Sequence, residues 1–205
     1  MSMYSSVRVE LWTRFEPRNC PLQFGFNCTW SRTRELDPLA WRRQPNYRAE
    51  NAADFWKAVY ETPYWYRPMQ DEPLRFGVDA AWRMRSWDVG LRLQVASGRP
   101  YTPVRAVATD PLNIKYGIAG DLGSAQYPLY RRLDARISRH FATTHVHWSL
   151  YADVLNVTAA ENVFQIRYNP AYTSRYVIRM LPTLPTLGLE ALPAGAPTPT
   201  ASLPA

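Results

Sequence analysis

The sequence has no long run of apolar residues. A helix that crosses a membrane needs about 18 or more of them in succession, so a helical membrane protein is excluded. A transmembrane β-barrel is not excluded, because its strands alternate polar and apolar residues and therefore average out in any hydropathy window.

Cysteine and lysine are also scarce. The two cysteines, Cys20 and Cys28, are too few for a disulfide framework. The net charge of +7 comes almost wholly from arginine, because Lys57 and Lys115 are the only lysines. The arginines are scattered through strand-like segments, often two residues from an acidic residue, and form no basic block. We therefore expect no nucleic-acid partner.

The residue spacings that carry chemistry are missing as well. The sequence has no Gly-x-Ser-x-Gly elbow, no spaced cysteine pairs and no His-Glu-x-x-His. The glycine-rich stretch 117–123 lacks the lysine of a phosphate loop, and His145 and His147 lack evident third and fourth metal ligands. We therefore expect no catalytic residues, no metal site and no cofactor, and a protein that is not an enzyme.

Alternation of apolar and polar residues is what the sequence does contain. In the segment 21–32, every second residue is apolar and the residues between them are polar or glycine. The same alternation recurs in 7–15, 74–84, 87–96, 132–141 and 146–154. A period of two predicts strands with one apolar and one polar face, and the tight connection at 85–86 predicts an antiparallel hairpin. The sequence therefore predicts an all-β, antiparallel meander.

The connections between these segments alternate in length. They are short at 16–20, 85–86 and 142–145, and long at 33–73 and 97–130. Strands of about ten residues with short turns at one end and long loops at the other are typical of a transmembrane β-barrel. Five aromatic residues near strand ends are predicted to form the interfacial girdles: Trp30, Trp82, Trp87, Trp148 and Tyr151.

The polar positions of the strands are rich in charge. Residues of both signs are predicted to line the lumen as a ladder of cross-strand ion pairs: Arg75, Asp79, Arg92, Arg132, Asp134 and Arg136. They could guide a polar solute or hold an interior domain. Alternatively, they only neutralise one another in a wet interior.

The first long loop is rich in aromatic side chains, and a period of three to four residues predicts a short helix over 49–62. Its aromatics could bind a ring-bearing or apolar ligand on the extracellular side, or could pack against one another. The candidate ligand residues are Trp41, Trp56, Tyr60 and Trp65.

Four local patterns together resemble a known family. They are Ser-Gly-Arg-Pro-Tyr-Thr-Pro at 97–103, the strand opening at 130–138, Asp-Val-Leu-Asn-Val at 153–157 followed by Glu-Asn-Val at 161–163, and the Leu- and Pro-rich segment 181–189. In this order and spacing, residues 5 to 192 resemble the C-terminal barrel strands of TonB-dependent outer-membrane receptors.

The resemblance implies a place in the outer membrane, in contact with its lipid, as a portion of a large barrel of the plugged, 22-stranded type. Such receptors take up scarce solutes, of the siderophore, cobalamin or glycan class, with energy relayed by the inner-membrane TonB complex. The plug domain, the remaining barrel strands and a signal peptide are not found in this sequence. We therefore expect a fragment, whose solute the sequence does not identify.

The family layout gives seven strands within a barrel segment, residues 1–192, and a disordered Pro-, Ala- and Thr-rich tail, residues 193–205. The expected strands are 5–16, 21–33, 73–85, 87–97, 129–142, 145–168 and 175–192. Bacterial single-chain barrels usually have an even strand number, so a curved open sheet is expected. Two alternatives stay open. One is a self-contained small barrel with a structural or adhesive role. The other is a soluble β-domain that binds carbohydrate or nucleic acid and packs its apolar faces together as a sandwich.

Overall fold

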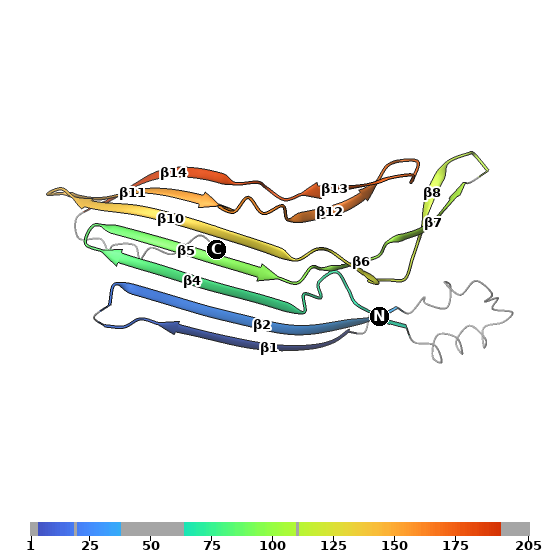
Figure 1. Ribbon diagram of the computed structural model, residues 1–205, viewed down its shortest axis with the longest axis horizontal. Coiled ribbons are helices and arrows are strands. Elements are labelled where there is room, and N and C mark those ends of the chain that lie inside the picture. The colour runs from blue at the N-terminus through green and yellow to red at the C-terminus, as the bar shows by residue number, and fades with distance from the viewer. Residues whose placement is uncertain (1–3, 19, 38–63, 110, 194–205) are drawn as a thin grey trace.

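The computed structural model describes residues 4–18, 20–37, 64–109 and 111–193. Every strand pairing in these ranges is antiparallel, and they contain no helix (Figure 1). It follows that none of these residues forms a helix able to cross a membrane. The main sheet has the spatial order β1 (Tyr4–Phe15), β2 (Leu22–Asp37), β4 (Leu74–Met84), β5 (Trp87–Ala96), β10 (Tyr130–Ala142), β11 (Val146–Leu155) and β14 (Leu184–Pro193), with β3 (Tyr64–Tyr66) paired to the end of β2. The predicted all-β, antiparallel fold is confirmed.

Short turns and long connections lie at opposite ends of this sheet (Figure 1). The turns at 16–21, 85–86 and 143–145 form its short-turn end. At the other end, the long-loop end, the described part of the long connections folds into further two-stranded sheets: β6 (Pro100–Tyr101) with β9 (Ala125–Gln126), β7 (Val104–Thr109) with β8 (Lys115–Ala119), and β12 (Val163–Tyr168) with β13 (Arg175–Arg179). The predicted separation of loop lengths is therefore confirmed for the described residues. The helix predicted at 49–62 lies outside them.

Two of the predicted strands are divided. The expected strand 145–168 is β11 followed by β12, and the expected strand 175–192 is β13 followed by β14. The two segments still run side by side, because β11 pairs with β14 and β12 pairs with β13. The last strand continues to Pro193, so the predicted boundary at 192 falls one residue early, and residues 194–205 of the predicted tail lie outside the described ranges.

Asparagine side chains explain the first division. Asn156 has a positive φ of 54°, which asparagine tolerates better than most residues. Its side chain closes a loop by accepting a hydrogen bond from the Ala160 N–H (3.0 Å) and donating one to the Ala160 carbonyl (3.1 Å). Asn162 then bonds both backbone groups of Arg131 in β10, at 2.9 and 2.7 Å. Its side-chain amide takes the place of a strand backbone, so β10 keeps its hydrogen bonds where β11 has ended.

One face of the main sheet is apolar across all of its strands. The register places Phe26 of β2, Val78 of β4 and Leu93 of β5 in one row, and the row continues to Leu133 of β10. No second layer formed by the described residues covers these apolar side chains: Leu150, for example, is 50% exposed. Apart from Pro68 and Pro100, the buried apolar residues in the described ranges are only Ala96 and Ala160.

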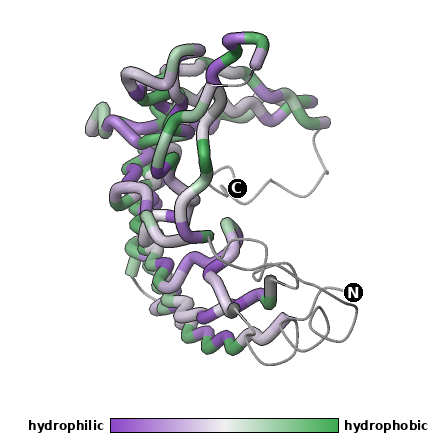
Figure 2. Tube along the Cα trace, turned by 90° about the vertical axis from the view of Figure 1, so that its right-hand side faces the viewer, coloured by the Kyte–Doolittle hydropathy of each residue, from purple (hydrophilic) through white to green (hydrophobic). Residues whose placement is uncertain are grey.

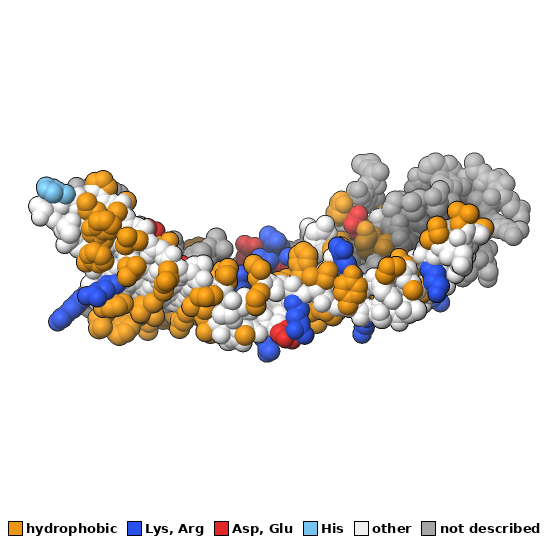
Figure 3. Space-filling model, turned by 90° about the horizontal axis from the view of Figure 1, so that it is seen from above, with side chains coloured by type: hydrophobic (Ala, Val, Ile, Leu, Met, Phe, Trp, Pro, Cys, Tyr) orange, Lys and Arg blue, Asp and Glu red, His pale blue; other side chains and the backbone are white. Residues whose placement is uncertain are grey.

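The opposite face is polar and concave. The sheet curves into an open arc (Figure 2). Seen from the β14 side, hydrophobic side chains are densest on the outer surface toward the short-turn end, interspersed with a few charged groups, and further charged groups are visible behind the rim (Figure 3). Polar residues of this concave face are among the most buried in the structure, including Asp134, Ser138 and Asp153. The sheet thus reverses the burial pattern of an ordinary water-soluble domain.

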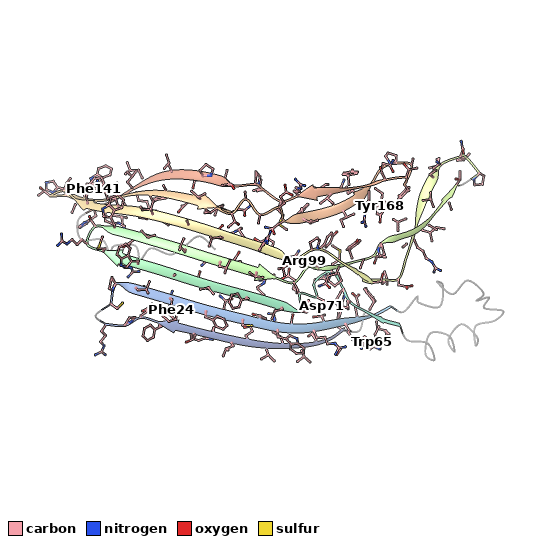
Figure 4. All side chains as sticks on the ribbon, in the orientation of Figure 1. Phe24, Trp65, Asp71, Arg99, Phe141 and Tyr168 are labelled. Carbon is pink, nitrogen blue, oxygen red and sulfur yellow. The ribbon has the colours of Figure 1, made fainter. Side chains whose placement is uncertain are left out.

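Aromatic side chains gather on the convex face near the short-turn end. Successive strands from β1 to β11 contribute Phe15, Phe24, Trp82, Trp87, Phe141 and Trp148. The rings of Phe15 and Phe24 lie 5.2 Å apart, and those of Phe141 and Trp148 lie 6.3 Å apart; Figure 4 labels Phe24 and Phe141 at this end. Tyr151 does not join them, contrary to prediction, because its register places it on the concave face.

Successive hairpins are displaced along the strands. The first ends at the pair Phe15 and Phe24, whose row continues to Ala80 in β4. The second ends four residues beyond Ala80, at the pair formed by Met84 and Trp87. The third hairpin ends further still, three residues beyond Arg139, the partner of Trp87 in β10. The strands are therefore inclined to the line that joins their turns, as strands are in a barrel wall.

Candidate functional site

The concave face holds all six polar residues that the sequence singled out for the lumen. They come from β4, β5 and β10 and are Arg75, Asp79, Arg92, Arg132, Asp134 and Arg136. The register brings three of them together directly, because Asp79 pairs with Arg92 and Arg92 with Asp134. Their position on one face agrees with the prediction, and their role in lining a lumen remains a prediction.

The ion pairs on this face are only partly cross-strand. Arg92 contacts Asp79 across β5 and β4 at 2.6 Å, and Arg136 contacts Asp153 of β11 at 3.4 Å. Arg132, in contrast, contacts Asp134 two residues along its own strand at 2.7 Å. The predicted ladder of cross-strand pairs is therefore corrected to a mixture of pairs across and along the strands.

Asp134 is the most buried carboxylate of the main sheet, with 3% of its surface exposed. Besides its contact with Arg132, it accepts a hydrogen bond from the backbone N–H of Asn156 at 2.8 Å. The Asn156 carbonyl in turn accepts a hydrogen bond from the Thr183 hydroxyl at 2.8 Å. Asp134 therefore ties β10 to the chain interruption after β11 and, through it, to the start of β14.

A second packed group lies between β10 and β14. The Arg136 guanidinium stacks on the Tyr151 ring, 4.1 Å from its centroid. The same ring lies over Gly188, its register partner in β14. A Cβ atom at Gly188 would come within 2.2 Å of the ring, so any larger residue at this position would displace Tyr151. The pairing matches the way in which an aromatic side chain covers a strand glycine in curved sheets.

On the concave face, the described residues line a smaller and a larger cavity. The smaller, of about 450 Å³, lies toward the short-turn end, where His140 contacts Asp88 at 3.0 Å. The larger, of about 860 Å³, lies toward the long-loop end. Its floor is formed by β4 and β5, and its walls by the segments 69–72, 97–99 and 127–130 and by β12. Its volume is that of a small-molecule site.

Two charged residues of the larger cavity were not predicted from the sequence, namely Glu72 and Arg99. The Glu72 carboxylate contacts Arg75 at 2.5 Å through one oxygen and Arg99 at 2.6 Å through the other. Burial alone would raise the pKa of Glu72, but hydrogen bonds from Arg99 and Arg75 outweigh it and hold the pKa below its ordinary value of 4.5. The residue therefore stays ionised and holds two guanidinium groups beside each other.

The segment that carries Glu72 is fixed to β2. Asp71, which is 1% exposed, accepts hydrogen bonds from Arg67 and from the backbone N–H of Thr33, each at 2.8 Å. The Ser31 hydroxyl donates to the Glu72 carbonyl at 2.8 Å. Glu72 is therefore held in place independently of its arginine partners.

The motif Ser97 to Pro103 fixes Arg99 in the same way. The Ser97 hydroxyl bonds both backbone groups of Leu74 at the start of β4. The Arg99 carbonyl accepts a hydrogen bond from the Tyr127 N–H at 2.9 Å. A Cβ atom at Gly98 would lie only 1.7 Å from the Tyr127 carbonyl oxygen, so glycine is required for this approach. Figure 4 places Arg99 and Asp71 together at the long-loop ends of β5 and β4.

The predicted loop aromatics are tested only at one position. Trp65 lies in β3, opposite Leu36 of β2, and is 38% exposed. Trp41, Trp56 and Tyr60 lie outside the described residues, so the extracellular aromatic site remains a prediction.

The described residues hold no cluster of three or more His, Cys, Asp or Glu side chains arranged to bind a metal ion. Comparisons with protein-family models, with curated proteins and with solved structures found no match to this chain. Any interpretation of the concave face must therefore be argued from the geometry of this chain alone.

Proposed function

We propose that the main sheet is part of the wall of an outer-membrane β-barrel of the TonB-dependent receptor type, which takes part in energy-coupled uptake of a scarce solute. The observation that carries this proposal is the reversed burial of the two faces. Apolar side chains such as Leu91 and Ile137 are each 44% exposed on the convex face, whereas the ion-paired residues Asp79, Arg92 and Asp134 lie on the concave face. Exposed apolar surface on this scale is rare on water-soluble monomers and is normal where the surrounding solvent is lipid.

The dimensions of the apolar face fit a bilayer. Along β4, its apolar positions run from Leu74 to Met84. At about 3.3 Å per residue and a tilt of about 40°, ten residue steps correspond to about 25 Å, the height of the apolar band in outer-membrane barrels. The aromatic row near the short-turn end corresponds to an interfacial girdle. Short turns at one end of the sheet and longer connections at the other are also typical of outer-membrane barrels.

The unpaired edges of the sheet favour a barrel wall that continues beyond the described strands. In the described ranges, β1 and β14 each have one neighbour in the main sheet and do not pair with each other. Unpaired strand edges are costly in hydrocarbon. We therefore infer that further barrel strands and a plug domain complete the lumen, with lipid on the convex face and the TonB complex as the energy source. This role is transport and not catalysis.

The two alternatives receive less support. A sandwich would bury the convex apolar side chains under a second layer, and such a layer is absent from the part of the chain that the structure describes. A self-contained barrel would pair β1 with β14. It would also run as a compact monomer on an unheated gel and change its mobility when heated. An open wall should show no such change in mobility and no steady conductance in planar bilayers.

Neighbouring positions on β5 provide a matched test of the lipid-facing wall. Leu93 points to the convex face and Gln94 to the concave face. In a Cys20→Ser, Cys28→Ala background, Leu93→Cys and Gln94→Cys are labelled with bimane, and the full chain is reconstituted with lipids that carry brominated acyl chains. We expect strong quenching at position 93 and weak quenching at 94. Equal quenching, or stronger quenching at 94, contradicts the proposal.

The uptake role needs a separate test. The gene is deleted in its host, and growth is measured with a ferric siderophore, with cobalamin or with an oligosaccharide as the limiting nutrient. Loss of growth on one of the three, restored by the intact gene, supports a receptor. Unchanged growth on all three contradicts an uptake role for these solute classes.

A further inference from the structure

The larger concave cavity combines a charged side with an apolar side. Charged lining residues are three arginines and two carboxylates: Arg75, Arg92, Arg99, Glu72 and Asp79. Arg92 and Asp79 form their own pair, so Glu72 alone balances the other two arginines. One positive charge is left in excess on this side of the cavity.

The two arginines that share Glu72 are available to a ligand. Each uses one nitrogen on the carboxylate, Nη2 for Arg75 and Nε for Arg99. A guanidinium has five N–H donors, so each retains donors beyond its bond to Glu72. Their side chains are 60% and 59% exposed, so these donors are accessible from the cavity. Adjacent guanidinium groups with accessible donors are suited to a carboxylate or phosphate.

The position of this arginine pair does not depend on a ligand. Glu72 is anchored through Ser31 and the neighbouring Asp71, and Arg99 through the backbone of Tyr127. Both guanidinium groups are therefore held before binding, which lowers the ordering cost of binding.

The remaining wall of the cavity is apolar and aromatic. It contains Met69, Tyr127, Phe164 and Met180. Three of these side chains are strongly exposed, namely Met69 at 61%, Phe164 at 63% and Met180 at 40%. Methionine and aromatic side chains pack well against ring-bearing ligands.

We propose that this cavity binds a small organic anion with an aromatic or apolar body, and that Arg75 and Arg99 hold its acid group while Phe164 and Met180 contact its body. The motif at 97–103 thereby acquires a function, which is to present Arg99. As a solute site of a receptor, the cavity rests on the proposed function, and it narrows the solute to anionic compounds over neutral glycans.

The test uses the full chain in detergent micelles and a pair of probes that differ in charge. Binding of 1-naphthoate is compared with that of 1-naphthalenemethanol, a neutral analogue of similar size, by equilibrium dialysis. We expect naphthoate to bind at least about tenfold more tightly, since charge-assisted hydrogen bonds add about 1.4 kcal/mol or more. Equal affinity for the two probes on the unaltered chain overturns the proposal.

Variants assign this preference to the cavity. Arg75→Gln with Arg99→Gln should weaken naphthoate binding at least about tenfold. Arg131→Gln with Arg139→Gln removes the same charge from the convex face and should leave the affinity unchanged. If the first variant misfolds, Arg75→Lys with Arg99→Lys retains the charge and should keep part of the affinity. A folded Gln variant with unchanged affinity overturns the assignment.

The bimane labels at positions 93 and 94 are measured in the same preparation with brominated detergent. If the anion does not bind but quenching is strong at position 93 and weak at position 94, the anion site is rejected and the barrel wall is still supported. Normal anion binding with reversed quenching rejects the barrel wall and retains the anion site.

Discussion

The convex and concave faces of the main sheet are made by the same strands but follow opposite rules of burial. On β11, Leu150 is 50% exposed on the convex face, while the neighbouring Ser149 is 8% exposed on the concave face. In a water-soluble protein these values would be reversed. This difference is what the proposed barrel wall requires, with lipid against the apolar side and the lumen against the polar side.

The largest expected effect comes from moving a charge between the faces at adjacent positions. Leu93→Arg should destabilise the lipid-inserted sheet by about 2–4 kcal/mol, because it places a charge against hydrocarbon near the bilayer centre. Gln94→Arg adds the same charge on the concave side and should cost less than about 1 kcal/mol. Urea titration of both variants in lipid vesicles measures the difference. Similar losses for both variants would contradict the assignment of the faces.

A smaller effect is expected from the most buried carboxylate of the concave face. Asp134→Ala removes the partner of Arg132 and the acceptor of the Asn156 N–H. We expect a loss of about 2–3 kcal/mol, because the half-buried Arg132 charge and the buried Asn156 N–H lose their partner together. Asp134→Asn keeps an acceptor for Asn156 and should lose less. The same urea titration ranks the two variants, and equal losses would show that the bond to Asn156 contributes little.

The Glu72 pair with Arg75 and Arg99 makes part of the stability depend on pH. Because the folded pKa lies below the ordinary value of 4.5, the contribution is fully present above about pH 4.5 and is lost as the pH falls through the folded pKa. Glu72→Gln should cost about 1 kcal/mol at pH 7 and should flatten the stability profile below pH 4.5. Unfolding curves from pH 7 to pH 3 test this, and parallel profiles for both proteins would contradict it.

The smallest effect concerns a charge on the apolar face. Arg139 lies near the short-turn end of the convex face and stacks on Trp87, 5.3 Å from the ring centroid. In the proposed barrel wall, this position would let the guanidinium extend to the membrane interface. Arg139→Gln should cost about 0.5–1 kcal/mol, the range of an exposed cation–π contact. A loss of unfolding free energy as large as that of Leu93→Arg would contradict a position of Arg139 at the membrane interface.

The phase of the strands could be predicted from sequence because a period of two assigns each residue to a face. Phe24, Phe76 and Leu150 were placed correctly on the convex side by this rule alone, and Asp134 and Arg136 on the concave side. Tyr151 was misassigned because an aromatic residue near a strand end was expected in a girdle, whereas its phase already placed it on the concave face.

Other features depend on contacts that alternation does not encode. The division of β11 from β12 depends on the side chains of Asn156 and Asn162 acting as backbone groups. The sharing of the Glu72 carboxylate depends on a contact with Arg99, which lies 27 residues further along the sequence. A glycine between Ser97 and Arg99 was the one local signal of that close approach.

Collision profiles along β5 would show which face of the sheet contacts lipid. Nitroxide labels are placed one at a time at positions 88 to 95 of the full chain in lipid, and collision rates are measured with oxygen and with a water-soluble nickel chelate. We expect a period of two, in which oxygen collides more often with labels at Val89, Leu91, Leu93 and Val95 and the nickel chelate more often with labels at the positions between them. The opposite phase, or no alternation, would contradict a wall with lipid on its convex side.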